Sequence, residues 1–210
     1  MNTKIKTILL KLETQSELEK FDKVKIPHDE LMLAITKDTG EFFNILLKTS
    51  KTKRVLEVGT SAGYSTLWFA DALIENGSNN CNIVSIEEDP AKINRAQKNF
   101  QEAGVSNIIE IRKGKAINIL KELLKNITED SQKFDFVFLD ADKENMIQYF
   151  DLVLPMVKSG GIIAADNILY PEKFREDMKK YSKFVASQPN VQSVTVPIGN
   201  GEEISYKIYE

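Results

Sequence analysis

The sequence predicts an α/β fold in which a mostly parallel sheet is covered by helices on both faces. Short, nearly continuous apolar runs alternate with longer amphipathic segments from residue 36 onward. Strands of this kind are buried on both faces, and the longer segments are typical of crossover helices. Near the C-terminus, apolar and polar side chains instead alternate on both sides of a glycine-containing turn. That pattern predicts a β-hairpin that closes the sheet with an antiparallel strand.

The expected strands are the short apolar runs. They are Arg54–Val58, Asn82–Glu87, Ile108–Ile111, Phe134–Leu139 and Ile162–Ala165. The expected helices are the amphipathic segments that precede or follow these runs. They are Thr36–Lys48, Ser65–Glu75, Pro90–Gly104, Ala116–Lys125, Glu144–Val157 and Glu172–Ser187. The hairpin arms are marked by Val194, Val196 and Ile198 before the turn at Gly199–Gly201, and by Ile204, Tyr206 and Ile208 after it.

Composition narrows the class of protein. Of the 210 residues, 42% are apolar and 28% are charged, as in an ordinary globular domain. The net charge of −3 provides no basic field, so nucleic acid is not an expected partner. The one cysteine allows no intrachain disulfide, which fits a cytoplasmic location. No stretch approaches the roughly 18 apolar residues of a membrane span.

Residues 1–35 are expected to form a helical extension ahead of a main domain at 36–210. The segment is charged and weakly amphipathic, and Leu9, Leu12 and Leu18 are spaced to line one helix face. Three roles are open for it: a lid over the core, a contact in a dimer, or one wall of a substrate pocket.

A glycine-containing loop follows the first expected strand. Glu57, Gly59 and Gly63 form the pattern Glu-x-Gly-x-x-x-Gly, whose glycines let the backbone approach a ligand before a helix begins. The acid would repel the pyrophosphate of a dinucleotide but suits the ammonium group of an amino-acid ligand. Glu87 ends the second strand, where an acid commonly accepts hydrogen bonds from ribose hydroxyls. It can also cap the next helix at the same time, although Asp89 is the better candidate for that cap. The loop and Glu87 together predict S-adenosylmethionine rather than NAD.

Oxygen-bearing side chains follow two later strands. Asp140 comes directly after the fourth expected strand, and Asp166 and Asn167 come directly after the fifth. If these strands are neighbours, about 4.8 Å apart, the three side chains converge at one sheet edge. Two carboxylates and an amide oxygen are hard ligands that suit Mg²⁺. Either pair alone is an ordinary cap or turn, but both at matched strand ends predict a metal site.

At these motifs the chain resembles a known family. Glu57–Ser65, Asp140–Asn145, Gly160–Gly161 and Asp166–Asn167 are similar to segments of the catechol and caffeoyl-coenzyme A O-methyltransferases, in the same order. The resemblance covers about Thr36 to Ile208. It implies a Rossmann-like three-layer sandwich with a seven-stranded sheet, order 3-2-1-4-5-7-6 and strand 7 antiparallel. It also implies a homodimer.

The resemblance assigns roles to individual residues. The positions that match contacts to S-adenosylmethionine are Thr36, Glu57, Gly59, Ser65, Glu87, Ala116, Asp140 and Asp142. The positions that match metal ligands are Asp140, Asp166 and Asn167, for Mg²⁺ or another divalent cation such as Mn²⁺ or Ca²⁺. Lys143 matches the proposed general base, so Lys143 and Asp140 form the expected catalytic pair.

The acceptor side departs from the family pattern. Tyr170 stands where many members have tryptophan, and Pro171-Glu172-Lys173 replaces the usual glycine-containing loop. No residue clearly matches the downstream acid that grips the second hydroxyl of a catechol. The resemblance therefore predicts the type of reaction better than the acceptor.

The sequence as a whole predicts a metal-dependent enzyme that methylates a hydroxyl of a small catechol-like or polyphenolic acceptor. In the expected mechanism the metal lowers the pKa of the hydroxyl, and neutral Lys143 takes its proton. One alternative is a metal-independent methyltransferase that acts on nitrogen, RNA or protein. The other is a binding protein that keeps the fold without catalysis.

Overall fold

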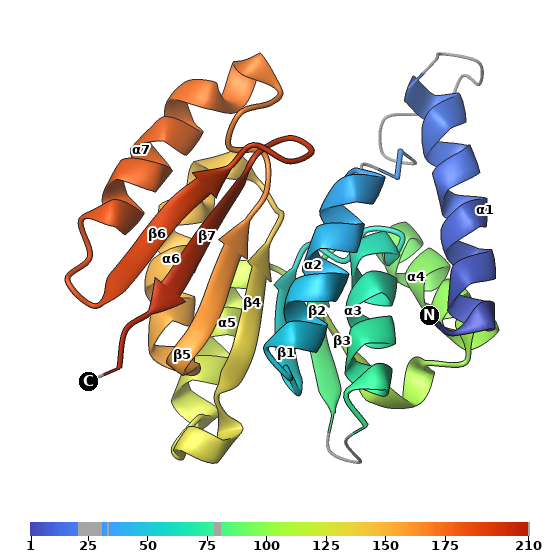
Figure 1. The fold of residues 1–210 in the computed structure, drawn as a ribbon, viewed down its shortest axis with the longest axis horizontal. Coiled ribbons are helices and arrows are strands. Elements are labelled where there is room, and N and C mark those ends of the chain that lie inside the picture. The colour runs from blue at the N-terminus through green and yellow to red at the C-terminus, as the bar shows by residue number, and fades with distance from the viewer. Residues whose placement is uncertain (21–30, 33, 78–80, 210) are drawn as a thin grey trace.

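A computed structural model describes residues 1–20, 31–32, 34–77 and 81–209 (Figure 1). Within these residues the chain forms one seven-stranded sheet of order β3-β2-β1-β4-β5-β7-β6. β7 pairs antiparallel with β5 and with β6, whereas the other neighbouring strands are parallel. The predicted strand order and the antiparallel hairpin are confirmed.

The strands follow the apolar runs of the sequence. They are β1 Arg54–Val58, β2 Asn82–Glu87, β3 Ile109–Lys113, β4 Phe134–Leu139, β5 Val157–Ala165, β6 Val191–Val196 and β7 Glu202–Lys207. The α-helices are α1 Thr3–Lys20, α2 Lys37–Thr49, α3 Tyr64–Glu75, α4 Pro90–Ala103, α5 Ala116–Asn126, α6 Met146–Val153 and α7 Arg175–Ala186. Short 3-10 turns are η2 Ser106–Ile108, η3 Asp130–Gln132, η4 Lys143–Asn145, η5 Leu154–Met156 and η6 Glu172–Phe174.

Two hydrophobic cores lie on the two faces of the sheet. Phe136 and Phe138 of β4 point into the first core, together with residues of α1, α2, α3 and α4. Val137 and Leu139, one residue out of phase, point into the second core with α5, α6 and α7. Figure 1 shows α2 and α3 on the near side of the sheet and α5 and α6 on the far side. Burial on both faces explains why these strands are continuously apolar.

One predicted helix was wrong in its extent. The segment Glu144–Val157 is divided into η4, α6 and η5, and β5 begins at Val157 instead of Ile162. Pro155 lies in η5, where its ring would clash with a carbonyl of a continuing helix. Gly160 and Gly161, interpreted as a helix stop, lie inside β5 where the register with β4 shifts. Glycine inside a strand commonly marks such an irregularity.

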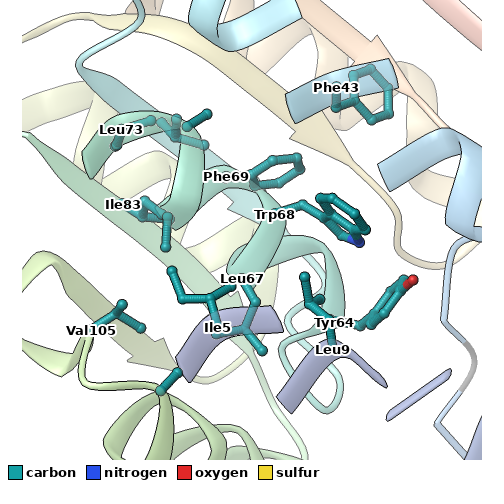
Figure 2. Close-up of a cluster of buried hydrophobic side chains, with 14 of the residues drawn as sticks. Ile5, Leu9, Phe43, Tyr64, Leu67, Trp68, Phe69, Leu73, Ile83 and Val105 are labelled. Carbon is teal, nitrogen blue, oxygen red and sulfur yellow. The ribbon is translucent and has the colours of Figure 1, made fainter. Parts of the chain in front are cut away.

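α1 packs along the first core. Ile5, Leu9 and Leu12 are buried, whereas the predicted third member of the stripe, Leu18, is 39% exposed. Figure 2 shows Ile5 and Leu9 beside Leu67 of α3 and other buried side chains. The helix thus covers core surface. The remaining residues of the predicted extension include 21–30 and 33, which lie outside the described residues. In the part of the chain that is described, no helix is long and apolar enough to cross a membrane.

Candidate functional site

A cavity of about 660 Å³ opens at the carboxyl ends of β1, β2, β4 and β5. Ligands of open α/β sheets bind at this edge. Among its lining residues are Gly59, Glu87, Ala116, Asp140, Asp142, Lys143, Asp166 and Asn167. Most of the side chains singled out by the sequence therefore meet at one cavity, and Glu57, Ser65 and Thr36 lie elsewhere.

The glycine loop needs its glycines for close approach. Gly59 has a φ of 104°, and a Cβ there would lie 2.0 Å from the backbone oxygen of Asp140. Gly63 caps α3 with a φ of 83°, and a Cβ there would lie 2.4 Å from the ring of Phe100. A side chain at either position would separate β1 from β4 or α3 from α4. The loop can therefore follow its tight path beside the cavity.

Glu57 lies behind the loop and has no exposed surface. Its carboxylate accepts hydrogen bonds from the hydroxyls of Ser65 at 2.5 Å, Thr66 at 2.6 Å and Ser85 at 2.5 Å. Burial raises the pKa of Glu57 to about 7, even though these hydroxyls favour the charged form. Ser65 lines a small hollow next to Gly59 and Asp140. Glu57 can thus affect a ligand through Ser65.

Glu87 supports the loop from the end of β2. Its carboxylate accepts hydrogen bonds from the backbone N–H groups of Ser61 at 2.9 Å, Glu88 at 3.0 Å and Asp89 at 3.1 Å. The helix cap of α4 is Asp89, whose carboxylate accepts from Ala91 at 2.7 Å. Asp89 is thus the cap, as predicted, and Glu87 lines the cavity, where its contact with a ribose stays a prediction.

Three further predicted contacts differ in placement. Ala116 begins α5 and Asp142 follows β4, and both line the cavity. The Asp142 carboxylate accepts hydrogen bonds from Tyr149 and Asn145. Thr36 instead caps α2, where its hydroxyl accepts from the backbone N–H of Thr39 at 3.4 Å.

The predicted metal ligands lie on adjacent strands. Leu139 and Ala165 are paired in the register, so Asp140 and Asp166 follow side by side. The ammonium group of Lys143 lies 3.0 Å from Asp140 Oδ1, and its side chain is 6% exposed. Burial, and then the charge of Asp140, raise the pKa of Asp166 to about 7. Asn167 has a φ of 68°, which asparagine tolerates better than most residues.

Glu202 is a site residue that the sequence reasoning missed. It begins β7, has no exposed surface and accepts a hydrogen bond from the Thr39 hydroxyl at 3.3 Å. Its carboxyl is also hydrogen bonded to that of Asp166, and burial raises its pKa to about 11. The alternation that predicted the hairpin already placed it in phase with Ile204 and Tyr206. An acid on that otherwise apolar face was the available signal.

The end of the cavity where the resemblance places the acceptor is formed by the segment after β5 and by the hairpin turn. Tyr170, Lys173, Phe174 and Asn200 line it. The Lys173 ammonium lies 4.6 Å from the centre of the Phe174 ring. α1 adds Ser16 and Glu19, so this helix both covers the core and forms part of the cavity wall.

The donor set fits a hard divalent cation. Across the described ranges, no group of three or more histidine, cysteine or acidic side chains is arranged to hold a metal. The predicted metal ligands include only two carboxylates, those of Asp140 and Asp166. The third predicted ligand is the amide oxygen of Asn167. Glu202 adds a third acid nearby, with Lys143 as a cation in contact with Asp140. Oxygen donors with excess negative charge suit Mg²⁺, Mn²⁺ or Ca²⁺.

Comparisons with known proteins point to one family. The model of a protein family described as O-methyltransferase matches residues 11–208. Catechol O-methyltransferase from Niastella koreensis is 37% identical over 145 residues, which cover 69% of this chain and 62%, less than two thirds, of that enzyme. Caffeoyl-CoA O-methyltransferase from Pinus taeda is 30% identical over 208 residues, covering 91% of this chain and 78% of the relative.

Solved structures show the same fold. The O-methyltransferase TomG from Streptomyces achromogenes, in complex with SAM, has a TM-score of 0.78 and 25% identity, covering 96% of this chain and 90% of its own. An O-methyltransferase from Bacillus cereus, in complex with SAH, has a TM-score of 0.77 and 23% identity, covering 99% of this chain and 91% of its own.

Proposed function

The chain belongs to the O-methyltransferase family, with relatives of the catechol and caffeoyl-coenzyme A type, and on that premise we propose a metal-dependent reaction. A methyl group passes from S-adenosylmethionine to a hydroxyl of a small catechol-like or polyphenolic acceptor. The observation that carries the proposal is the convergence of Asp140, Asp166, Asn167 and Lys143 on the cavity that the glycine loop borders.

The donor half of the site holds S-adenosylmethionine. Glu87 accepts hydrogen bonds from the ribose hydroxyls, and Gly59 allows the backbone to approach the amino-acid end. Ser65, oriented by Glu57, contributes a hydroxyl at that end. Ala116, Asp142 and Thr36 complete the proposed contacts, with Thr36 acting from the cap of α2.

The acceptor half holds the metal and the substrate. Asp140, Asp166 and Asn167 provide the protein oxygens for Mg²⁺, or for Mn²⁺ or Ca²⁺. When bound, such an ion polarises an acceptor oxygen and lowers the pKa of its hydroxyl. Tyr170 and Phe174 provide aromatic surface for a flat acceptor.

Lys143 is the proposed general base. Its side chain is almost fully buried and lines the cavity, so in its neutral form it can reach an acceptor hydroxyl and take its proton. Asp140 orients the lysine through their contact at 3.0 Å. The remaining acceleration comes from holding the acceptor oxygen in line with the methyl group.

The deciding experiment separates cofactor binding from metal-dependent turnover. Asp166→Ala removes one of two anionic ligands, so we expect methylation of a catechol to be lost or to recover only at high Mg²⁺. Its affinity for S-adenosylmethionine, measured by calorimetry, should stay near that of the wild type. Asp135→Ala is the matched control, because Asp135 lies at the other end of β4 and pairs with Lys158.

One result would support the metal-independent alternative. If Asp166→Ala methylates a catechol in EDTA at the wild-type rate, the metal mechanism is refuted. The acceptor itself is to be identified by screening catechols, hydroxycinnamoyl thioesters and flavonoids with and without Mg²⁺.

We also propose a homodimer that uses the uncovered face of β6 and β7. The predicted contact through residues 1–34 is less suitable, because the apolar residues of α1 are largely buried in their own core. Val194 is 59% exposed and Tyr206 is 36% exposed, and no helix lies in front of these strands in Figure 1. Sedimentation of wild type and Val194→Lys tests this, and a wild-type monomer at micromolar concentration contradicts it.

A further inference from the structure

We propose that Glu202 is a positioning residue of the metal site. It holds the Asp166 carboxyl in the orientation in which that residue faces Asp140 and the cavity. Glu202 is not among the residues that line the cavity. It would therefore act through Asp166. This inference rests on the metal site of the proposed function.

The sheet places Glu202 directly opposite Asp166. β5 and β7 are antiparallel, and the last pair of residues within the two strands is Ala165 with Glu203. The next pair in that register is Asp166 with Glu202. Side chains of opposite residues share a face, with Cβ atoms about 4.5–5.5 Å apart. The hydrogen bond between the two carboxyls is thus a consequence of strand register.

The direction of that hydrogen bond follows from its surroundings. Glu202 Oε2 is buried and receives no hydrogen from a donor among the described residues. The Thr39 hydroxyl donates a hydrogen bond to the other oxygen, Oε1, at 3.3 Å. Two carboxyls bond only when one of them donates, and Asp166 must be deprotonated to bind a metal, so in the metal-bound site the donor is Glu202. A carboxyl that donates in this way fixes the angle of its partner, as outer groups do for metal ligands.

A second contact fixes Glu202 itself. Thr39 lies in the first turn of α2, and that turn is pressed against the turn between β6 and β7. A Cβ on Gly199 would lie 2.1 Å from the Thr39 hydroxyl oxygen. Asp38 accepts a hydrogen bond from the Gly199 N–H at 3.4 Å. Glu202 thus joins α2, the hairpin and Asp166.

Burial alone does not explain an acid at this position. Its alternation partners Ile204 and Tyr206 are apolar or aromatic, and an aliphatic side chain would be easier to bury than a carboxyl. The neighbouring Glu203 offers a comparison, since it is also buried but faces the opposite side of the sheet. Its carboxylate accepts from Thr195 at 2.6 Å and from Ser182 at 3.1 Å, away from the cavity.

Glu203 therefore provides the matched control for an experiment on metal affinity. We would titrate full-length protein with Mn²⁺ and follow the free ion by electron paramagnetic resonance. Glu202→Leu removes the donor to Asp166, and we expect about 10–100-fold weaker Mn²⁺ binding, the usual effect of losing an outer partner. Glu203→Leu should bind Mn²⁺ as the wild type does.

Glu202→Gln tests the mechanism. Its amide oxygen can accept from Thr39 while its N–H donates to Asp166, so most of the lost affinity should return. A Gln variant as weak as the Leu variant overturns positioning by hydrogen bonding. If circular dichroism shows that Glu202→Leu is unfolded, Thr39→Val takes its place. It removes the hydrogen bond from the Thr39 hydroxyl to Glu202 and should also weaken Mn²⁺ binding.

The outcomes distinguish this inference from the proposed function. If the wild type binds Mn²⁺ and Glu202→Leu binds it equally well, the role of Glu202 is overturned and the proposed metal site stands. Wild type that binds no Mn²⁺ overturns the metal site and this inference together. Weakened binding in Glu202→Leu, with Glu203→Leu unchanged and Glu202→Gln restored, supports the assignment.

Discussion

The proposed donor and acceptor halves of the site differ in how their acids are hydrogen bonded, including the acids that lie behind the cavity wall. In the donor half, Glu57 is satisfied by three hydroxyls and Glu87 by three backbone N–H groups. In the acceptor half, Asp140, Asp166 and Glu202 lie close together, and among the described residues Lys143 forms its ion pair with Asp140. The acids of the donor half already have hydrogen-bond donors within the chain, whereas those of the acceptor half lie against one another, as the proposed cation site requires.

The difference follows from how each half is built. The donor half comes from one βαβ unit, so its loop, strand ends and helix N-termini supply hydroxyl and backbone donors to the acids nearby. The acceptor half is assembled from β4, β5 and β7, whose strand ends each bring an acid. Close carboxylates raise one another's pKa unless a cation or a shared proton intervenes. The acids of the donor half are therefore held in place by the protein itself, whereas the arrangement of acids in the acceptor half depends on a cation or a shared proton.

The largest expected effect in this comparison is on turnover in the acceptor half. Lys143→Ala should lower kcat for a catechol by about 10²–10⁴-fold, the usual contribution of a general base. The loss should shrink as pH rises, because the acceptor hydroxyl then ionises without help. Lys158→Ala is the control, since Lys158 also pairs with an aspartate, at 2.6 Å, but at the far end of the same strands. Unchanged kcat in Lys143→Ala would remove the lysine from the mechanism.

A second effect is on the pH dependence of stability in the donor half. Burial raises the pKa of Glu57 from 4.5 to about 7 in the folded protein. The folded state then holds a proton that the unfolded chain releases, so this residue costs stability as pH rises from about 4.5 to about 7. At about 1.36 kcal/mol per pH unit, the total is about 3 kcal/mol, and it stays lost at higher pH.

Glu57→Gln should remove this pH dependence. Urea unfolding of ligand-free wild type and variant across that range measures the gap between their free energies of unfolding. We expect the gap to move in favour of the variant as pH rises and to level off above about pH 7. A gap that does not change with pH would show that the Glu57 carboxyl titrates alike in both states.

The sequence predicted the strands that carry the site better than it predicted the surroundings of each side chain. β1, β2 and β4 have the predicted bounds, because continuous apolar runs with short polar borders mark buried strands clearly. Asp140 and Asp166 could be placed together, since parallel neighbours end at the same edge. These signals are local, or need only the order of the strands.

The missing parts depend on contacts between distant segments. Glu202 meets Asp166 only because β7 pairs antiparallel with β5 in one register, which alternation alone does not specify. Glu57 was expected beside the ligand, but Ser65, Thr66 and Ser85 come together around it only in the folded chain. One error had a local cause: α6 ends at Val153, two residues before Pro155, and the continuous apolar pattern concealed that stop.

The smallest expected effect separates the two ends of the bound cofactor. Glu87→Ala removes a charged acceptor for ribose hydroxyls, so S-adenosylmethionine should bind about 1.5–3 kcal/mol more weakly by calorimetry. Methylthioadenosine has the ribose but lacks the amino-acid end, and its affinity should fall by a similar factor. Ser65→Ala should weaken S-adenosylmethionine and leave methylthioadenosine unchanged. Glu110→Ala, an exposed acid on β3, is the control. If Glu87→Ala binds both ligands as the wild type does, Glu87 serves only to brace the loop through Ser61.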